Sequence, residues 1–540
     1  MPRYTREYRC GCALSIPLLT TLMIAGCRVG PNYTQPSPRL QQEWMDAGQP
    51  GIQRGPAELA KWWEGFNDPV LNDLVTRAYQ NSPPLLAAAV RVLQAQAARG
   101  IAVGYLFPQR QEATGGYSWN QASENSGAVE QHQSKWASRI STLRALQAPL
   151  GTAVRNAVGD PSIDPSYSNW AVTGLSVGWE LDIWSRFRHG IEAADAAVLA
   201  SVATYDDVLV SLIAEVATNY VQVRTLEEQL DIVRQNCQIQ KDSLAIVQQR
   251  REGGTATELD VAQAQTLLHD TEAQIPATEA SIRQTRVALC VLLGMPPQDI
   301  TQLLGEKHAI PAPPESIAVS VPAELLRRRP DIRRAERQLA AQNAYIGIAF
   351  ADFYPSFSLA GDIGLSAEHF EDLWRGNSFQ AFAGPSFRWA VLNYGRIENN
   401  VRVQDAAFQA AISDYEGLVL RAQGEVESAI AGLVGAQHQI APLTGSTDAA
   451  SRAVNVATQQ YKGGIADYIR VLVAQQNLIT EQSRLISTRG SAAQNMITLY
   501  RALGGGWELR QGNDLVPTEI KDQMRKRTNW GAMIDADRVP

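Results

Sequence analysis

An apolar side chain recurs at nearly every third or fourth position of residues 198–247, VLASVATYDDVLVSLIAEVATNYVQVRTLEEQLDIVRQNCQIQKDSLAIV. Steps that alternate between four and three residues form the heptad seam by which one helix packs against others. Because an α-helix rises about 1.5 Å per residue, this seam corresponds to about 75 Å of helix. A compact domain does not need a helix of that length, so the pattern predicts a rod.

The chain repeats this pattern 210 residues later. Adding 210 to each seam position gives a second seam in the same phase, from Phe408 to Ala457. The same offset relates WELDIWSR (179–186) to WAVLNYGR (389–396), Gly253-Gly254 to Gly463-Gly464, and Leu293-Gly294 to Leu503-Gly504. A register that is kept without a gap from 179 to 294 predicts two copies of one structural unit.

Upstream of these blocks the offset between the two copies is 247 residues, because Pro83 corresponds to Pro330 and Pro108 corresponds to Pro355. The difference between the two offsets means that the first copy carries 37 additional residues between positions 107 and 179. Their sequence is rich in glycine, serine and proline, which predicts a loop-like insert.

Each seam ends at a glycine pair and is followed by a second amphipathic run, in QQRREGGTATELD and in QQYKGGIADYIR. Glycine supplies the backbone conformation that ends a helix and reverses the chain. We therefore expect two long helical hairpins, at about 186–294 and about 396–504. Pro276 and Pro442 each lie 22 residues from a turn glycine, and they predict local kinks at matching heights.

At the other end of each copy the apolar period changes to two, which is typical of β-strands. The alternating residues are Leu175, Val177, Trp179 and Leu181 in the first copy, and Phe357, Leu359, Ile363, Leu365, Phe387, Trp389 and Val391 in the second. Such segments with aromatic ends are typical of transmembrane β-strands, although half-buried strands of a soluble sheet also alternate. We expect β-hairpins at about 109–182 and about 356–392. Four strands cannot close a barrel in lipid, so other copies of the chain have to complete the sheet.

The chain is thus predicted to be mainly α-helical with a membrane β-barrel, built from two internal repeats. We expect a signal peptide at 1–26, an N-terminal segment at 27–70, the first repeat at 71–294, a linker at 295–320, the second repeat at 321–504 and a C-terminal tail at 505–540. Trp62 and Trp63 are expected to pack this N-terminal segment against the body of the protein.

The first residues have the features of a secretory signal, with arginines at positions 3, 6 and 9 before an apolar stretch at 13–24 that is too short to span a bilayer. The following Ala25-Gly26-Cys27 resembles the bacterial lipobox, in which the thiol is acylated and cleavage leaves Cys27 as the new N-terminus. A chance cysteine after an ordinary signal peptide is the alternative. Cys237 and Cys290 then remain, and their expected separation of about 28 Å along the hairpin keeps both free and buried.

Composition and motifs exclude several kinds of function. A net charge of -7 with 19% charged residues argues against nucleic-acid binding. The sequence contains no G-x-x-x-x-G-K phosphate loop and no metal-ligand spacing among its six histidines, so we expect no cofactor, no metal site and no catalytic residues. Five arginines between positions 327 and 334 are expected to form a solvated helix start.

Four segments resemble a known family: LLRRRPDIRRAE (325–336), IGIAFADFYPSFSL (346–359), WELDIW (179–184) and YKGGIADYIRVLVAQQ (461–476). They are similar to the outer-membrane efflux proteins, the TolC-like outer-membrane factors, in the acylated, NodT-like branch that serves multidrug pumps. The resemblance covers nearly all of the chain from Cys27 to Gly504. It implies a homotrimer in the bacterial outer membrane, with a twelve-stranded β-barrel and an α-helical barrel that extends into the periplasm.

The same resemblance implies that the chain is the duct of a tripartite efflux system. Such a duct passively conducts substrates that an inner-membrane efflux pump and a periplasmic adaptor, or membrane fusion protein, deliver to it. The acyl group on Cys27 would anchor it in outer-membrane lipid, and no nucleic acid is expected as a partner. The alternative is a periplasmic lipid-anchored coiled-coil scaffold or adaptor without a pore, which would leave the alternating aromatic segments unexplained.

Matched residue by residue, the resemblance places functional positions at the tips of the two helical hairpins. It implies a periplasmic gate at Asp260, Ile469, Arg470, Val473 and Gln476, and adaptor docking at Gly253, Gly254, Thr255, Gly463, Gly464 and Ile465. Relatives usually carry carboxylates near 470 or 473, so this chain departs from the acidic ring of the family. Asp260 and Arg470 occupy equivalent repeat positions, and we hypothesise that they pair to hold the tip closed; solvated tip charges are the alternative.

Overall fold

A computed structural model describes residues 27–45, 48–49, 52–55, 58–121, 166–306, 309–314, 317–319 and 322–535. The expected signal peptide at 1–26 and most of the predicted insert, at 122–165, lie outside the described residues. The chain divides into two compact units. Of the described residues, those within 27–31, 101–191 and 346–402 form the strand unit, and those within 32–100, 192–345 and 403–535 form the helical unit.

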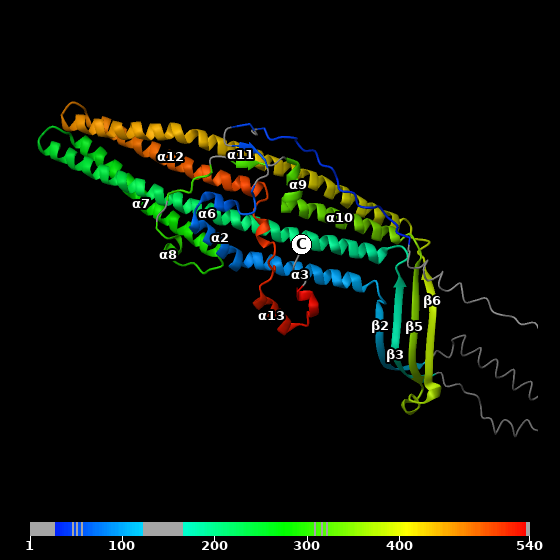
Figure 1. The fold of residues 1–540 in the computed structure, drawn as a ribbon. Helices are drawn as coiled ribbons and strands as arrows, with labels where there is room; N and C mark the ends of the chain where they lie inside the picture. The colour runs from blue at the N-terminus through cyan, green and yellow to red at the C-terminus, as the bar shows by residue number, and fades with distance from the viewer. Residues whose placement is uncertain are drawn as a thin grey trace, which may run out of the picture. The chain divides into compact units, whose positions relative to one another are not determined.

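The strand unit is built on one four-stranded antiparallel sheet (Figure 1). Its strands, in spatial order, are β2 (Arg110–Gln121), β3 (Ser166–Leu181), β5 (Ser356–Ala367) and β6 (Phe379–Arg388). Two hairpin segments that are far apart in the sequence therefore meet at the β3–β5 pair, where Trp179 lies opposite Leu359. Both edges are open, because β2 and β6 each pair with only one strand of the described chain.

The two faces of this sheet differ in polarity, since residues directly opposite each other on neighbouring strands share a face. One face carries Tyr117, Trp170, Val172, Leu175, Val177, Trp179, Leu359, Ile363, Leu365, Phe379 and Phe387. The other carries Glu112, Ser118, Asn169, Ser176, Glu180, Ser358, Asp362, Ser366, Gln380, Ser386 and Arg388. The separation is not complete, because Phe382, Ala171 and Ala360 lie on this polar face and Gln111 lies on the apolar face. A register shift between Thr173 and Leu175 keeps the apolar residues of β3 on one face.

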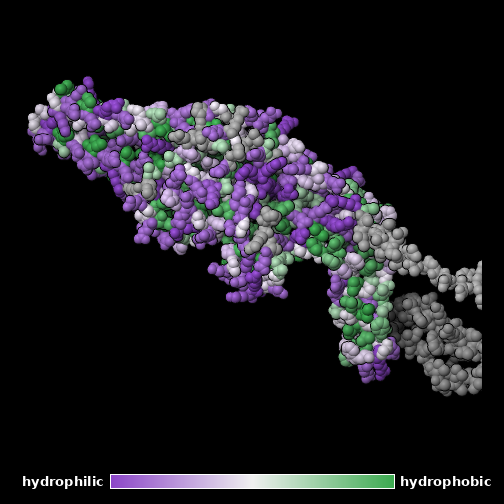
Figure 2. All heavy atoms as spheres, in the orientation of Figure 1, coloured by the Kyte–Doolittle hydropathy of each residue, from purple (hydrophilic) through white to green (hydrophobic). Residues whose placement is uncertain are grey.

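Hydrophobic residues gather over these strands, whereas hydrophilic residues cover most of the helices (Figure 2). Nine of the ten residues of β6 are exposed in the single chain. Apolar residues at the surface of a sheet are unfavourable in water, so this surface requires another environment or a partner.

Four long helices follow the strands in two consecutive pairs. They are α6 (Arg186–Glu252), α7 (Glu258–Leu292), α11 (Arg396–Lys462) and α12 (Tyr468–Ala502). The bounds of the second pair are those of the first pair shifted by 210 residues. None of the thirty positions in the two heptad seams is exposed, so the seam side chains form the helix contacts that the sequence predicts.

Glycine conformation explains both turns between the paired helices. Gly254 has φ of +76° and Gly464 has φ of +74°, in the left-handed region that favours glycine. In each turn the following residue donates its backbone N–H back to the last helical turn, from Thr255 to Arg250 at 2.8 Å and from Ile465 to Gln460 at 2.9 Å. These bonds satisfy carbonyl groups that the end of a helix leaves unpaired.

Shorter elements complete the molecule. They are β1 (Ile52–Arg54), α2 (Pro69–Asn81), α3 (Pro83–Gly104), α8 (Thr301–Leu304), β4 (Ile317–Val319), α9 (Leu325–Arg328), α10 (Pro330–Ala351), α13 (Thr518–Arg527) and several short 3-10 helices. In the helical unit, Trp62 and Trp63 are both buried, and Trp62 stacks on Tyr500 with ring centroids 5.1 Å apart. The predicted packing of this N-terminal segment is confirmed.

Two other features of the helices bear on the sequence predictions. Cys237 and Cys290 are free and buried, as expected. Pro276 lies inside α7 and Pro442 inside α11.

Helix α6 is long and apolar enough to span a membrane, but more than half of its most apolar window is buried within the chain. That burial marks it as a core helix of the bundle.

The expectation of a solvated helix start at 327–334 was wrong. Of the five arginines Arg327 alone is exposed, and the other four form ion pairs with carboxylates of distant segments. The pairs are Arg328 with Glu508, Arg329 with Asp331 and Glu425, Arg333 with Asp206, and Arg334 with Asp207. Most of these carboxylates lie about a hundred residues or more away, so local sequence did not indicate them.

Candidate functional site

The two hairpin tips pack against each other through a small apolar cluster in the helical unit. The first hairpin contributes Val247, Val261, Ala264 and Leu267, and the second contributes Tyr461, Tyr468, Val471 and Leu472. All eight side chains are buried, and the rings of Tyr461 and Tyr468 meet edge to face at 5.4 Å. The tips of the two repeats are therefore held together within one chain.

Arg250 joins the two tips with its guanidinium group. This group donates hydrogen bonds to the backbone carbonyls of Tyr461 and Lys462, and it lies 4.6 Å from the centre of the Tyr461 ring. The last carbonyls of α11 have no partner within their own helix, so a cation at this end is favourable. Sequence reasoning missed Arg250, although two arginines in the last helical turn before a helix-ending glycine pair were a signal for this role.

Burial raises the pKa of Tyr461 and of Tyr468 above the usual value, and the negative charge of Asp260 raises both further. The Arg250 guanidinium opposes this shift at Tyr461. Both phenols therefore remain neutral at physiological pH, and the cluster carries no buried phenolate.

Asp260 forms a capping box at the start of α7. Its carboxylate accepts hydrogen bonds from the backbone N–H and the hydroxyl of Thr257, each at 2.9 Å, and its own N–H donates to the Thr257 hydroxyl at 3.2 Å. A carboxylate here satisfies free N–H groups and interacts favourably with the helix dipole. No ion pair joins Asp260 and Arg470, both described here, so the hypothesised contact is not made within one chain.

The other residues of the expected gate lie on one exposed side of α12. Ile469 is 47% exposed and Val473 is 46% exposed, although both are large apolar residues. Gln476 and Arg470 are also exposed. The positions 469, 473 and 476 follow the spacing of one helix face. The expected docking residues Gly253, Gly254, Thr255, Gly463, Gly464 and Ile465 are all exposed.

Cys27 is exposed and lies two residues before a tightly held backbone in the strand unit. The Nε2 atom of His189, which is buried, lies 2.8 Å from the carbonyl oxygen of Val29, and its N–H donates to that oxygen. Gly30 has φ of +99°, and a Cβ atom at this position would lie 2.7 Å from the Cα of Gly347. Glycine is thus required where the segment that follows Cys27 crosses α10.

Comparisons with known proteins agree with this architecture. Residues 74–295 and 321–505 match the family model described as outer membrane efflux protein. The solvent efflux pump outer membrane protein SrpC of Pseudomonas putida is 30% identical over 506 residues, which cover 92% of this chain and 99% of that protein. Nodulation protein T of Rhizobium leguminosarum bv. trifolii is 26% identical over 487 residues, which cover 90% of this chain and 96% of that protein.

Among solved structures, the outer-membrane channel OprN matches with a TM-score of 0.77 and 28% identity, covering 89% of this chain and all of that chain. The fold is that of a TolC-like outer-membrane channel. The chain belongs to the outer membrane efflux protein family. It is an outer-membrane channel component of an efflux system and a transport conduit, not an enzyme, as the sequence predicts.

Proposed function

We propose that the chain is one subunit of a homotrimeric duct, in which three four-stranded sheets close a twelve-stranded β-barrel in the outer membrane. The open edges of β2 and β6 support this assembly. Lipid cannot satisfy their unpaired N–H and C=O groups, so each edge needs a strand from another chain. The apolar face of the sheet then faces lipid, and the polar face lines the pore. The two-faced sheet with open edges is the observation that carries the proposal.

The helical hairpins form the periplasmic part of the duct in this proposal. We assign 71–294 and 321–504 to the two repeats, 27–70 to the anchored N-terminal segment, 295–320 to a linker and 505–540 to a tail. The exposed apolar row on α12 supports a gate, because Ile469 and Val473 would meet their counterparts in neighbouring chains. The exposed tips at Gly253–Thr255 and Gly463–Ile465 are available to a periplasmic adaptor.

Cys27 carries the lipid anchor in the proposed duct. Its exposure and its position next to the segment held by His189 support acylation at a fixed place beside the strand unit. The duct itself supplies no energy for transport. An inner-membrane efflux pump and its adaptor deliver the substrate, which is therefore selected by the pump.

Purification of the mature chain in detergent tests the proposal. A duct gives a detergent-soluble trimer by light scattering and ion-conducting events in planar lipid bilayers. A Cys27→Ala variant separates the duct from a pore-free, lipid-anchored scaffold. If the protein is a duct, the Cys27→Ala variant still requires detergent, because its strands lie in the membrane. A variant that is monomeric and stable in water without detergent would refute the duct.

A further inference from the structure

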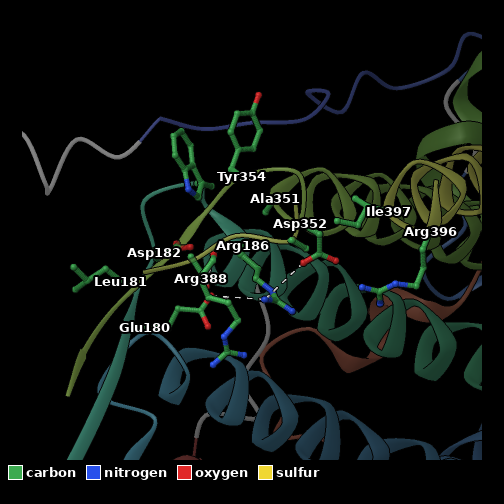
Figure 3. Close-up of a pocket in the computed structure, with 13 residues that line it drawn as sticks. Glu180, Leu181, Asp182, Arg186, Ala351, Asp352, Tyr354, Arg388, Arg396 and Ile397 are labelled. Atoms are coloured by element: carbon green, nitrogen blue, oxygen red, sulfur yellow. Dashed lines mark hydrogen bonds and ion pairs between the residues drawn. The ribbon is translucent and has the colours of Figure 1, made fainter. Parts of the chain in front are cut away.

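The strand unit contains a cavity of about 370 Å³ where the sheet gives way to helices (Figure 3). The strands β3, β5 and β6 and the helices α6, α10 and α11 all contribute to its lining. Glu180, Ser356 and Arg388 belong to the polar face of the sheet, so the cavity opens on the side away from the apolar face. A cavity of this size accepts a small molecule but not a folded partner.

The carboxylates around this cavity already have partners. Asp182 pairs with Arg188 at 2.9 Å and accepts backbone N–H groups of Phe187 and Arg188 at 3.0 and 3.1 Å. Arg186 lies between Glu180 and Asp352, at 3.7 Å from each, as the dashed lines in Figure 3 mark. Asp182 is therefore satisfied within the chain, and Glu180 and Asp352 share one guanidinium group.

Two arginines of the cavity, in contrast, are not engaged by its carboxylates. The lining holds three arginines, Arg186, Arg388 and Arg396, and three carboxylates, Glu180, Asp182 and Asp352, and Asp182 is already paired with Arg188 from outside the lining. Arg388 and Arg396 form no ion pair within the described chain, and Arg396 extends from α11 toward Arg186 and Asp352 in Figure 3. Each guanidinium group offers about five N–H donors and no acceptor.

The donors of these side chains match the geometry of an oxyanion. A guanidinium group binds carboxylate or phosphate oxygens through two parallel hydrogen bonds, and charge-assisted bonds of this kind are stronger than neutral ones. At 3.7 Å the contacts of Arg186 are longer than hydrogen bonds, so its donors are also available to a ligand. Ser356 lines the same cavity, and its hydroxyl donates to the backbone carbonyl of Arg388 at 3.3 Å.

We propose that Arg186, Arg388 and Arg396 form a binding site for a small oxyanion, a carboxylate or a phosphate, on the pore side of the duct. The inference rests on the proposed duct, because that assembly makes the polar face of the sheet the wall of the pore. The site binds anions at the junction of strands and helices, and three copies would form a ring of arginines. The apolar face lies on the opposite side of the sheet, so the anion comes from the aqueous pore and not from lipid.

Titration calorimetry on the purified protein in detergent tests the site directly, with sodium phosphate and sodium acetate as separate probes. Saturable binding of at least one probe is expected. The variants Arg388→Gln and Arg396→Gln should each weaken it by about tenfold or more, because each removes charge-assisted hydrogen bonds. The matched control is Arg375→Gln, which also removes one positive charge but breaks only an ion pair with Asp372, outside the cavity. Circular dichroism verifies that each variant is folded.

The comparison of the two probes identifies the preferred oxyanion. The variant Arg388→Lys tests whether the two parallel hydrogen bonds of a guanidinium group are needed. Lysine keeps the charge but cannot form two parallel hydrogen bonds, so binding should weaken while the charge of the site is unchanged. Absence of saturable binding to wild-type protein, or equal binding by wild type, Arg388→Gln and Arg396→Gln, would overturn the proposal and leave three solvated arginines.

Reversal potentials in a potassium chloride gradient separate this site from the duct itself. The double variant Arg388→Gln/Arg396→Gln should be more cation-selective than wild type and than Arg375→Gln. Phosphate binding by a wild-type protein that conducts no ions would refute the duct and with it the pore position of the site. A conducting wild type without anion binding would refute the site alone. Binding with an unchanged reversal potential would refute its position at the pore wall.

Discussion

Asp206 shows how strongly a single buried charge depends on its partners. Its side chain is fully buried in α6 and pairs with Arg333 of α10 and with Arg510, which is itself 4% exposed. Both arginines also lie over the ring of Trp507, at 4.6 and 5.6 Å from its centre. The carboxylate of Asp206 is therefore satisfied by two arginines at once, and its loss removes an ion-pair partner from both.

Asp206→Ala should lower the free energy of unfolding by about 3–5 kcal/mol, because it leaves two arginines without their carboxylate. Asp207→Ala is the matched control, since this neighbour pairs with Arg334 at 2.8 Å where both side chains are about one third exposed. Its loss should cost about 0–1 kcal/mol. Urea unfolding in detergent, followed by circular dichroism, measures the difference, and similar losses for the two variants would contradict the buried network.

Gly347 tests the attachment of the segment that follows Cys27. A Cβ atom on Gly347 would lie 2.6 to 2.8 Å from three atoms of the His189 ring, so Gly347→Ala has to displace the ring that holds Val29. We expect faster proteolysis within residues 27–45 in limited digestion. Gly190→Ala is the control, because nothing lies within 4 Å of its added methyl group. Equal cleavage rates for the two variants would show that His189 does not hold the segment.

At the scale of the elements, Arg250 should stabilise the contact between the tips of the two helical hairpins. Arg250→Ala removes the bonds to the carbonyls of α11 and the contact with the Tyr461 ring, together worth about 1–3 kcal/mol. If opening separates the tips, the open probability of single channels in bilayers should rise by about tenfold. Arg251→Ala is the control, because its pair with Glu258 is exposed on both sides. An unchanged open probability in Arg250→Ala would show that opening leaves the tips together.

The helices and turns could be predicted from the sequence because the interactions that form them are local. The heptad seam of α6 and the glycine pair at Gly253-Gly254 act over a few residues, and both recur 210 residues later. The tip contacts were not readable, since Arg250 binds a carbonyl 211 residues away. The hypothesised contact between Asp260 and Arg470 is not made within the chain. The partner of Asp260 is instead local, because Thr257, three residues before it, donates two hydrogen bonds to its carboxylate. The cavity arginines come from segments that meet only in the folded sheet.

At the scale of the whole molecule, the helices and the strands present surfaces suited to two different environments, water and lipid. Hydrophilic residues cover most of the helical surface in Figure 2, whereas the strands carry one apolar face. Four strands with open edges cannot provide a closed surface to lipid. If the proposed trimer forms, assembly and membrane insertion should depend on each other, because its barrel would be complete only when the third chain has joined.

Two neighbouring residues of β5 distinguish a lipid-facing sheet from a soluble one. Ile363 is 52% exposed on the apolar face, and Asp362 lies beside it on the polar face. On a soluble sheet, Ile363→Lys would replace an exposed apolar residue with a charge and would be tolerated or favourable. In lipid it should cost about 2–4 kcal/mol near the middle of the membrane. The amount of folded trimer recovered from outer membranes should therefore fall for Ile363→Lys.

Asp362→Lys provides the matched control for this experiment. It places the same side chain one residue away but on the polar face, which the proposed duct turns toward its aqueous pore, where a charge remains hydrated. Its yield of trimer should stay near that of wild type. Because the two positions alternate along one strand, a general disturbance of β5 would reduce both yields equally. Normal assembly of Ile363→Lys would mean that the apolar face does not meet lipid, and the barrel would have to be abandoned.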